Sequence, residues 1–245
     1  MGYIYQPSGA AKEYCEWALN IYTGCPHACS YCYCPKVLHK EAKEFYSKVE
    51  PRKNIVNGVR KQIEREHITG RLVHLCFIGD PYPTGYDSSA TREIIKLLKD
   101  SGNHVQILTK GDGSRDFDLL DENDWYGITV SSFAQKDTMT ENGIMPRCPH
   151  EPRAINPYAR IARAEAARRK GMKTWISLEP VVDADVLETF ACFATSFDKV
   201  KIGKLNYHPS VINWKEFGQK AEALCQKLGL EYYIKDSLRK EMEKP

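Results

Sequence analysis

The chain has 245 residues, and its 35 Lys and Arg residues nearly balance its 32 Asp and Glu residues, giving a net charge of +3. This charge argues neither for nor against a nucleic-acid partner, and no apolar stretch approaches the ~18 residues of a membrane span. Nine scattered cysteines without a secretory signal indicate a reducing cytosol rather than a disulfide framework. We therefore expect a cytoplasmic protein with a single domain over residues 1–245.

Apolar runs and amphipathic stretches alternate along the chain, and this alternation predicts β/α units that build a parallel sheet. Strands are expected near residues 17–22, 72–79, 104–110, 126–133, 173–179 and 199–204, with a further short one at 232–234. Helices are expected near residues 52–68, 89–101, 115–122, 155–170, 185–195 and 213–228, with a short charged one after Asp236. The predicted fold class is therefore α/β.

The helix expected at 155–170 has the clearest pattern, because small and apolar residues recur in it at helical spacing. They predict a buried face made of Ile155, Ala159, Ala162 and Ala166. Arg160 and Arg163 fall elsewhere on the helix, so we expect them on a solvated, charged face.

One face of several expected strands is partly polar. In the strand at 173–179, Ile176 and Leu178 alternate with Trp175, Ser177 and Glu179, and the two preceding strands alternate similarly. A complete eight-stranded barrel fills its interior with branched apolar side chains, whereas an open barrel of six units leaves room for a cofactor. The pattern favours a partial (β/α)6 barrel, and an open doubly wound sheet is the alternative.

A cysteine motif follows the first strand. Cys25, Cys29 and Cys32 lie in the run from Tyr22 to Pro35 with the spacing C-x3-C-x2-C. A [4Fe–4S] cluster normally takes four cysteine ligands, so three thiolates in one loop leave one iron open to bind another molecule. The spacing therefore predicts a cluster with an open iron.

A structural zinc site is the alternative interpretation of this loop. Cys34 offers a fourth thiolate and His27 an imidazole, although zinc sites usually combine one ligand pair with a second pair farther along the chain. Cys32 and Cys34 are only one residue apart, which is tight for two ligands of one tetrahedral ion. A non-catalytic, cysteine-rich metal-binding module thus stands beside the enzyme hypothesis.

With these residues the chain resembles the radical SAM superfamily, and within it the spore photoproduct lyase-like branch, also described as DNA repair photolyase-like. The resemblance covers a core of about residues 18–206 and leaves 207–245 as a C-terminal extension. It implies a partial (β/α)6 TIM-like barrel, with a [4Fe–4S] cluster and S-adenosyl-L-methionine (SAM) as cofactors. It also implies an enzyme that cleaves SAM to a 5′-deoxyadenosyl radical, which abstracts hydrogen from a substrate, and a low-potential donor such as flavodoxin or ferredoxin.

The resemblance also assigns SAM contacts to residues in the loop and at strand ends. Tyr31 would contact the adenine, the turn of Gly79 and Asp80 the methionine amino group, Lys110 the methionine carboxylate, and Ser131 the nucleoside or methionine part. A carboxylate such as that of Asp80 accepts charge-assisted hydrogen bonds from an ammonium, which agrees with this assignment. Taken singly, Lys110 and Ser131 also fit a solvated lysine and a buried hydroxyl, but three successive strand ends favour cofactor contacts.

Two further residues are expected to take part in the reaction. Tyr33 matches a tyrosine implicated in hydrogen-atom relay in the lyase. Glu179 ends its strand directly before Pro180, where it would contact SAM or substrate, or form a structural salt bridge. Cys34 receives no role from the motif.

The substrate is less well defined by the sequence. Spore photoproduct lyase has a hydrogen-donor cysteine three residues before the motif aspartate, but Phe77 stands there in this chain and Cys76 is one place away. Neighbouring strand residues point to opposite faces, so this departure puts thymine-dimer repair in doubt. A loop over 134–153 is expected to cover the pocket, with Cys148 and His150 as surface residues.

Two substrate classes follow from these observations. A nucleic acid or nucleobase is favoured by the family resemblance and by basic residues of the first helix, although these residues also fit an ordinary solvated helix face. The basic residues are Arg52, Lys53, Arg60, Lys61 and Arg65. A small molecule or peptide is the second class.

Overall fold

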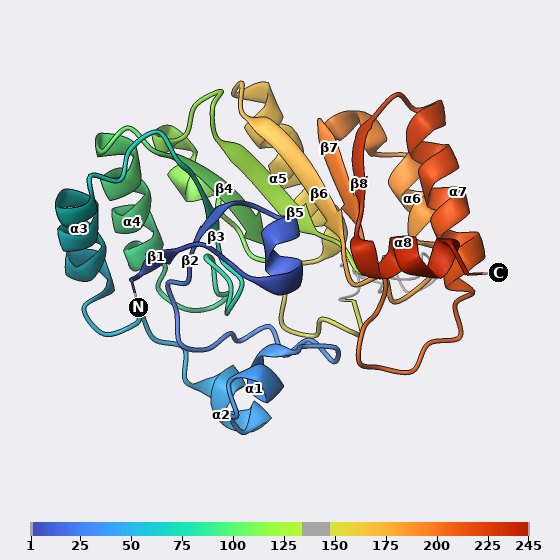
Figure 1. Cartoon of the computed structure of the whole chain (residues 1–245), viewed down its shortest axis with the longest axis horizontal. Helices are drawn as coiled ribbons and strands as arrows, with labels where there is room; N and C mark the ends of the chain where they lie inside the picture. The colour runs from blue at the N-terminus through green and yellow to red at the C-terminus, as the bar shows by residue number, and fades with distance from the viewer. Residues whose placement is uncertain (1, 134–147, 245) are drawn as a thin grey trace, which may run out of the picture.

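The computed structural model describes residues 2–133 and 148–244, and every structural statement below concerns these residues. One sheet of eight strands runs through the molecule, with the strands in chain order (Figure 1). β1 pairs antiparallel with β2, and each later strand pairs parallel with the strand before it. The strands are β1 (Ile4–Tyr5), β2 (Trp17–Leu19), β3 (Leu72–Leu75), β4 (His104–Thr109), β5 (Trp125–Thr129), β6 (Lys173–Leu178), β7 (Lys199–Ile202) and β8 (Glu231–Ile234).

Helices connect the parallel strands, and α5 packs against β5 and β6 on the outer face of the sheet. The short helix η1 lies over the opposite, inner face, in front of the sheet in Figure 1. The helices are η1 (Gly9–Glu13), α1 (Cys34–Val37), α2 (Ala42–Ser47), α3 (Ile55–Glu66), α4 (Ser89–Asp100), η2 (Ser114–Leu119), α5 (Pro157–Arg169), α6 (Val186–Ala191), η4 (Ala194–Ser196), α7 (Trp214–Lys227) and α8 (Asp236–Met242).

The hydrophobic core lies between the outer face of the sheet and its helices. In β4, Val105 and Ile107 are fully buried, and α4 contributes Ile94, Ile95 and Leu98 to the same cluster. The spacing of these α4 residues places them on one side of the helix. Each such side chain stabilises the fold by about 1.5–3 kcal/mol when it is buried. This core fixes the strands, and with them the loops at their carboxyl ends.

The inner face of the sheet is polar, as the sequence predicted. His74 of β3 and Gln106 of β4 are both buried there, and the Gln106 Nε2 donates to the His74 Nδ1 at 3.0 Å. Gln106 also donates to the Tyr14 carbonyl at 3.1 Å, and the Lys201 Nζ of β7 donates to the same carbonyl at 3.0 Å. The segment after η1 is therefore fixed to both sides of the inner face.

Trp175 of β6 packs over one part of this inner face. Its indole Nε1 donates to the Ile107 carbonyl at 2.9 Å across β5. The ring lies directly over Gly127, where a Cβ atom would come within 2.1 Å of the indole nitrogen. A glycine in the middle of β5 therefore makes room for the largest side chain of the interior.

The predicted α/β class, the partial barrel of mostly parallel strands and the order of its units are confirmed. The structure adds β1, η1, α1 and α2, which the sequence pattern did not predict because these elements are too short to show a period. In the described chain, no helix is long and apolar enough to cross a membrane.

The prediction for the buried face of α5 was wrong. Ala162 is exposed and Ala159 is only half-buried, whereas Arg160 is fully buried. The helix turns this arginine inward because its guanidinium is neutralised and hydrogen-bonded there, as described below. The residues that α5 buries are Pro157, Arg160, Ile161, Ala164 and Ala167.

Candidate functional site

The three motif cysteines lie in the loop that follows β2, at the edge of the sheet where the parallel strands end. Cys29 is buried, and Cys25 and Cys32 are half-buried. The Cys25 N–H donates to the Phe45 carbonyl of α2 at 3.1 Å, and the Ser30 N–H donates to the His150 carbonyl at 3.0 Å. The predicted ligands therefore share one loop that is anchored at two points.

Within the described residues, the sulfurs of the cysteine loop are not gathered around one point. Tetrahedral zinc holds sulfur at ~2.3 Å, which brings its sulfur ligands within ~4 Å of one another. Over the described ranges, no three of the sulfurs of Cys25, Cys29, Cys32 and Cys34 lie mutually within 4.8 Å. A [4Fe–4S] cluster binds each cysteine through a different iron and spaces them more widely. Three thiolates in one anchored loop are a donor set that fits such a cluster with one iron left open.

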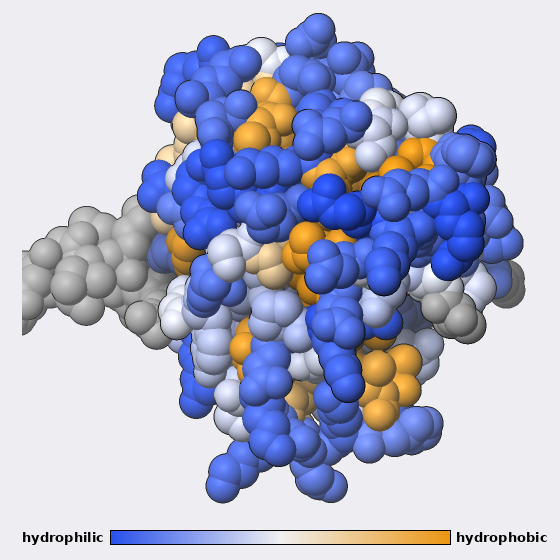
Figure 2. Space-filling model, turned by 90° about the vertical axis from the view of Figure 1, so that its left-hand side faces the viewer, coloured by the Kyte–Doolittle hydropathy of each residue, from blue (hydrophilic) through white to orange (hydrophobic). Residues whose placement is uncertain are grey.

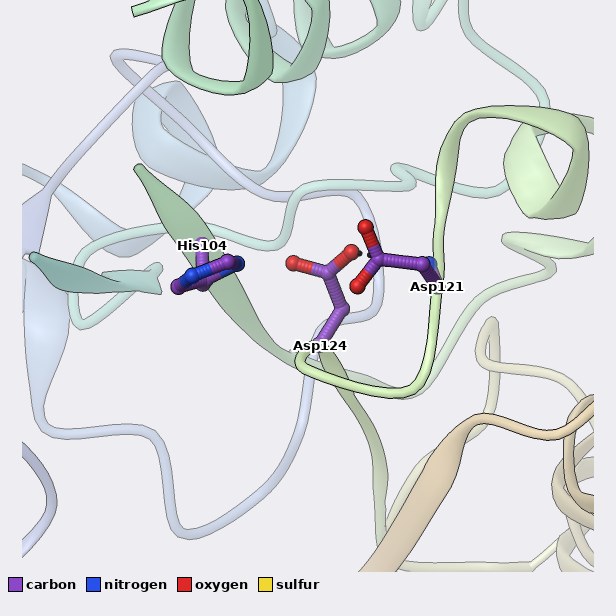
Figure 3. A group of neighbouring side chains, drawn as sticks. All are labelled: His104, Asp121 and Asp124. Carbon is purple, nitrogen blue, oxygen red and sulfur yellow. Dashed lines mark hydrogen bonds between the residues drawn. The ribbon is translucent and has the colours of Figure 1, made fainter. Parts of the chain in front are cut away.

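His104, Asp121 and Asp124 do bring their ligand atoms within 4.8 Å of one another, and Figure 3 shows the two carboxylates side by side next to the imidazole. The Lys99 Nζ already lies 2.6 Å from Asp121 Oδ2 and 2.5 Å from Asp124 Oδ2. An ammonium therefore neutralises this pair. The group also lies at the starts of β4 and β5, at the edge opposite the cysteine loop, so we interpret it as a structural ion cluster.

Asp80 joins the end of β3 to the end of β4. Its Oδ1 accepts from the Thr109 hydroxyl at 2.6 Å and the Tyr82 N–H at 2.8 Å, and its Oδ2 accepts from the Lys110 N–H at 2.8 Å. The His27 Nδ1, from the cysteine loop, lies 3.5 Å from Oδ2. The carboxylate thus holds two strand ends and the cysteine loop together.

The turn that contains Asp80 lies directly against the cysteine loop. Gly79 has φ of +79°, and a Cβ atom there would lie 2.9 Å from the Gly24 carbonyl oxygen. Only glycine adopts this backbone close to another chain segment without strain. Asn20, at the end of β2, accepts from the N–H groups of Phe77 and Ile78 at 2.9 and 2.8 Å. Gly79 therefore has a conformational reason to be glycine.

A buried polar network surrounds Tyr31. Its hydroxyl donates to Glu151 and accepts from the Ser131 hydroxyl at 2.7 Å. Glu151 pairs with the Nη2 of Arg160 at 2.5 Å, and neither side chain is exposed. The Lys110 Nζ lies 5.6 Å from the centre of the Tyr31 ring. The structure therefore brings together Tyr31, Lys110 and Ser131, which lie far apart in the sequence.

Charges in this network depend on one another. Burial raises the pKa of Glu151, but the positive charges of Arg160 and Lys110 outweigh burial and keep that pKa low. Burial lowers the pKa of Lys110, but the nearby Cys29 and Glu151 raise it by more than burial lowers it. The pKa of Lys110 therefore lies above its usual value, and the ammonium persists. Burial, followed by the Glu151 charge, raises the pKa of Tyr31 well above its usual value. An ammonium thus stands between the cysteine loop and an ionised glutamate.

Tyr33 and Cys34 lie on the other side of the loop. The Tyr33 hydroxyl donates to the Phe77 carbonyl at 2.7 Å, and the residue as a whole is 47% exposed. The buried Cys34 thiol lies 3.7 Å from the same carbonyl. The neighbouring Cys34 thiol is the chief cause that lowers the pKa of Cys32 to about 7.

Glu179 faces the inner side of the sheet. It accepts a hydrogen bond from the Tyr14 hydroxyl, which also lies 3.3 Å from the Ser177 hydroxyl. The Lys235 Nζ lies 3.6 Å from its carboxylate. Its side chain passes over Gly203, where a Cβ atom would clash at 2.8 Å. Glu179 therefore forms the salt bridge that the sequence analysis considered, and Tyr14 joins it inside the barrel.

Phe77 takes the place expected for a hydrogen-donor cysteine. The centre of its ring lies 4.4 Å from that of the His74 ring and 5.7 Å from that of the Tyr14 ring, on the inner face. Cys76 is buried in the hydrophobic cluster. Cys148 is 1% exposed and lies 3.1 Å from the Ser132 hydroxyl, so its expected surface position was wrong. Residues 134–147 of the predicted covering loop lie outside the described residues.

Sequence reasoning missed three residues at this site. Arg160 was placed on a solvated helix face, although arginine at this point is fully buried. Glu151 received no role because it lies in a segment without periodicity. Tyr14 lies far in sequence from Glu179, so no local pattern joins the two. α5 also carries Arg163, Glu165, Arg168 and Arg169, so nothing in the sequence set Arg160 apart from the other charged residues of the helix.

Comparison with known proteins identifies the family. The sequence model of the Radical SAM superfamily matches residues 19–186. The uncharacterized protein ORF301 of Acidianus two-tailed virus is 29% identical over an alignment of 185 positions that covers 71% of this chain and 58% of that protein. Uncharacterized protein Rv2578c of Mycobacterium tuberculosis (strain ATCC 25618 / H37Rv) is 28% identical, over 72% of this chain and 52% of its own. The chain thus spans a little over half the length of these curated relatives.

Solved structures show the same fold. A spore photoproduct lyase with bound AdoMet and dinucleoside spore photoproduct has a TM-score of 0.65 at 13% identity, covering 94% of this chain and 79% of that chain. SuiB of Streptococcus suis, bound to S-adenosylmethionine, has a TM-score of 0.59 at 12% identity, covering 89% of this chain and 46% of that chain. With a family match over more than half of its length, this chain belongs to the radical SAM superfamily and has a fold like that of spore photoproduct lyase.

Proposed function

We propose that this chain is a radical SAM enzyme that abstracts hydrogen from a substrate held at the inner face of its sheet. Cys25, Cys29 and Cys32 would hold a [4Fe–4S] cluster, which when bound supplies the electron that cleaves SAM to a 5′-deoxyadenosyl radical. The observation that carries this proposal is the set of three cysteines with the spacing C-x3-C-x2-C in one anchored loop, in a chain whose residues 19–186 match the radical SAM family. A low-potential donor such as flavodoxin or ferredoxin would provide the electron.

The surrounding residues would orient SAM. The Lys110 ammonium, beside both Cys29 and Tyr31, has the charge to bind the methionine carboxylate. The Tyr31 ring would contact the adenine, and the Ser131 hydroxyl, which already reaches the Tyr31 hydroxyl, would contact the nucleoside or methionine part. The network of buried charges supports these roles because it keeps the Tyr31 ring in one position.

The turn of Gly79 and Asp80 would bind the methionine amino group. Because the Asp80 carboxylate already accepts three hydrogen bonds from its own chain, its proposed part is to hold the turn in place beside the cysteine loop. Tyr33 and Glu179 would contact the substrate and help to exclude water from the radical. The positions of the two residues support these roles, because Tyr33 flanks the cysteine loop and Glu179 faces the inner side of the sheet.

The test is anaerobic iron–sulfur reconstitution, reduction in the presence of SAM, and an assay for 5′-deoxyadenosine. We expect about four irons per chain and formation of 5′-deoxyadenosine. Cys25→Ala should lose both, whereas Cys192→Ala, at an exposed cysteine, should behave like the unmodified protein. Stoichiometric zinc without iron, or a loaded cluster that never cleaves SAM with any substrate class tried, would contradict the proposal.

For the substrate we favour a nucleic acid or nucleobase, which the enzyme would repair or modify. The likeness to a spore photoproduct lyase bound to a dinucleoside supports this class at the level of the fold. The basic residues Lys53, Arg60, Lys61 and Arg65 of the α3 region are exposed. Figure 2 looks onto the left-hand side of Figure 1, which carries α3, and hydrophilic residues cover most of this surface. A charged nucleic-acid backbone is compatible with such a surface.

A small molecule or peptide is the second candidate, and the N-terminal segment favours it. Tyr14 occupies the inner face between His74 and Trp175, and the centre of its ring lies 5.6 Å from that of His74 and 6.0 Å from that of Trp175.

Binding to single- and double-stranded oligonucleotides at several salt concentrations separates the two classes of substrate. A nucleic-acid substrate predicts a steep loss of affinity with salt, and a shallow slope with weak affinity supports the smaller substrate.

A further inference from the structure

The loop over residues 203–213, which follows β7, meets helix α1 at the edge of the sheet where the parallel strands end. In Figure 1 both segments lie below the sheet, on the side of the cysteine loop. The Lys36 Nζ of α1 lies 5.9 Å from the centre of the Tyr207 ring, within the range of a cation–π contact. An aromatic ring and an ammonium therefore lie together next to the helix that follows the cysteine motif.

Tyr207 is presented to solvent instead of being packed into the fold. The residue is 86% exposed, and its φ of +64° lies in the left-handed region, which bulky side chains rarely adopt. The Asn206 Nδ2 donates to the Lys204 carbonyl at 3.2 Å and stabilises the turn directly before it. An exposed ring on a strained backbone contributes little to stability, and backbone strain of this kind clusters at functional sites. The ring is thus open to a bound molecule.

Other exposed apolar side chains belong to the same two segments. Six large hydrophobic residues are exposed in the described chain, and the four with the highest exposure are Tyr33, Val37, Tyr207 and Val211. Tyr33, Lys36 and Val37 have the spacing of one helix face at α1. Exposed apolar residues that gather with a cation at one edge of a sheet indicate a binding surface.

The chemistry of Tyr207 and Lys36 matches a single-stranded nucleic acid. A base stacks on an exposed tyrosine ring through its π-face, and a lysine beside the ring neutralises a phosphate of the backbone. Lys36 is exposed and, in the described chain, pairs with no carboxylate, so its charge is available to a phosphate. In a duplex the bases already stack on one another, so a ring at the protein surface reaches only an unpaired base.

We propose that Tyr207 and Lys36 form a binding site for single-stranded nucleic acid, in which one base stacks on the Tyr207 ring and an adjoining phosphate binds the Lys36 ammonium. The site lies at the edge of the sheet that carries the cysteine loop, so a strand bound there is next to the proposed reaction centre. This inference rests on the proposed function and restricts its substrate to a nucleic acid with unpaired bases.

The test measures the affinity of the reconstituted protein, with SAM present, for labelled single- and double-stranded oligonucleotides by fluorescence anisotropy. Tyr207→Phe keeps a ring for stacking, whereas Tyr207→Leu keeps an apolar side chain without one. For single strands we expect the unmodified affinity in Tyr207→Phe and a loss of at least about fivefold in Tyr207→Leu, the lower end of the stacking of one base. Tyr86→Leu is the control and should bind normally, because the Tyr86 hydroxyl donates to the Ser47 carbonyl and ties this exposed tyrosine to α2.

Lys36→Gln tests the phosphate contact through the salt dependence of binding. We expect the slope of log affinity against log salt to become shallower by about 0.7, which corresponds to one phosphate of a single strand. Lys227→Gln, at an exposed lysine that ends α7, should leave the slope unchanged.

Three results would overturn the inference: no affinity of the unmodified protein for single strands, equal affinities in Tyr207→Leu and the unmodified protein, or equal losses in Tyr207→Leu and Tyr86→Leu. Weaker binding of a peptide in Tyr207→Leu, without an effect on oligonucleotides, would also overturn it and would assign the ring to the other substrate class. The proposed function fails by a separate result, a loaded cluster that never yields 5′-deoxyadenosine, because oligonucleotide affinity does not require cleavage of SAM.

Discussion

Arg160 is the residue on which the Tyr31 side of the site depends. Its guanidinium pairs with Glu151 and donates to the carbonyls of Thr129 and Ile155, both at 2.7 Å. One side chain thus links the end of β5, the start of α5 and the glutamate that holds the Tyr31 hydroxyl. A planar cation with several fixed donors suits this position, and a lysine would not satisfy the same acceptors.

Replacing this arginine should destabilise the fold strongly. Arg160→Met leaves the Glu151 carboxylate buried without its partner, and breaking such a pair costs about 3–5 kcal/mol. Arg168→Met is the control on the same helix, because Arg168 pairs with Asp198 at the surface and should contribute less than ~1 kcal/mol. Urea unfolding of both variants measures the difference. Equal losses of stability would contradict the role assigned to Arg160.

At the scale of elements, the segment Gly9–Tyr14 is the feature that closes the inner face. Lys201 holds it from β7 by donating to the carbonyls of Glu13 and Tyr14 at 2.7 and 3.0 Å. Its Nζ also lies 4.6 Å from the centre of the Tyr14 ring. In the described chain Lys201 has no carboxylate within salt-bridge distance, so its charge is stabilised by carbonyls and aromatic rings.

The charge of Lys201 should make stability depend on pH. Burial, followed by the charges of Lys199 and Lys235, lowers its pKa from 10.5 to about 8. Between pH 8 and 10 the folded chain has lost this proton while the unfolded chain still holds it, so the contribution of Lys201 to stability rises with pH. We expect the free energy of unfolding to increase with pH in this window relative to Lys201→Met. Parallel curves for the two proteins would refute the expectation.

The long helices and the strands of the parallel sheet were predictable from the sequence, whereas β1, η1, α1 and α2 were not. The helix at 89–101 and the strand at 104–110 have residue patterns long enough to reveal their period, and both appear in the structure. The family resemblance named Lys110 and Ser131, and the structure places both beside Tyr31, because strand ends meet at one edge of a parallel sheet. Helix α2 has six residues, and its role beside the cysteine loop arises from tertiary contacts that no local pattern carries.

At the scale of the whole molecule, side-chain contacts join the segment that follows the last strand, β8, to the helix η1 that follows the first strand, β1. Lys235, directly after β8, donates to the Ala10 carbonyl at 3.0 Å and pairs with Glu13 at 3.4 Å. The Asp236 N–H donates to the Glu13 carboxylate at 3.0 Å. The extension predicted after residue 206 therefore contacts the N-terminal segment directly, and it supplies β8 as a pairing partner for β7.

A chain that ends after residue 206 should therefore lose far more than its missing residues. It leaves Ile202 of β7 without its pairing partner in β8 and removes the contacts of Lys235 and Asp236 with the segment Gly9–Tyr14. We expect a loss of at least about 5 kcal/mol, comparable with the total stability of many domains. Urea unfolding followed by circular dichroism measures it, with a chain ending after residue 243 as the control. A cooperative transition at the control midpoint would show that the extension is dispensable for folding.

The contact between Lys235 and η1 also has a consequence for the order of events during synthesis. On the ribosome, the cysteine loop emerges some 200 residues before Lys235. In a nascent chain the cysteines can thus be exposed while the inner face near Glu179 has not yet been packed against Lys235. Iron and sulfide would meet a more accessible chain during translation than after release, when the first and last segments have come together.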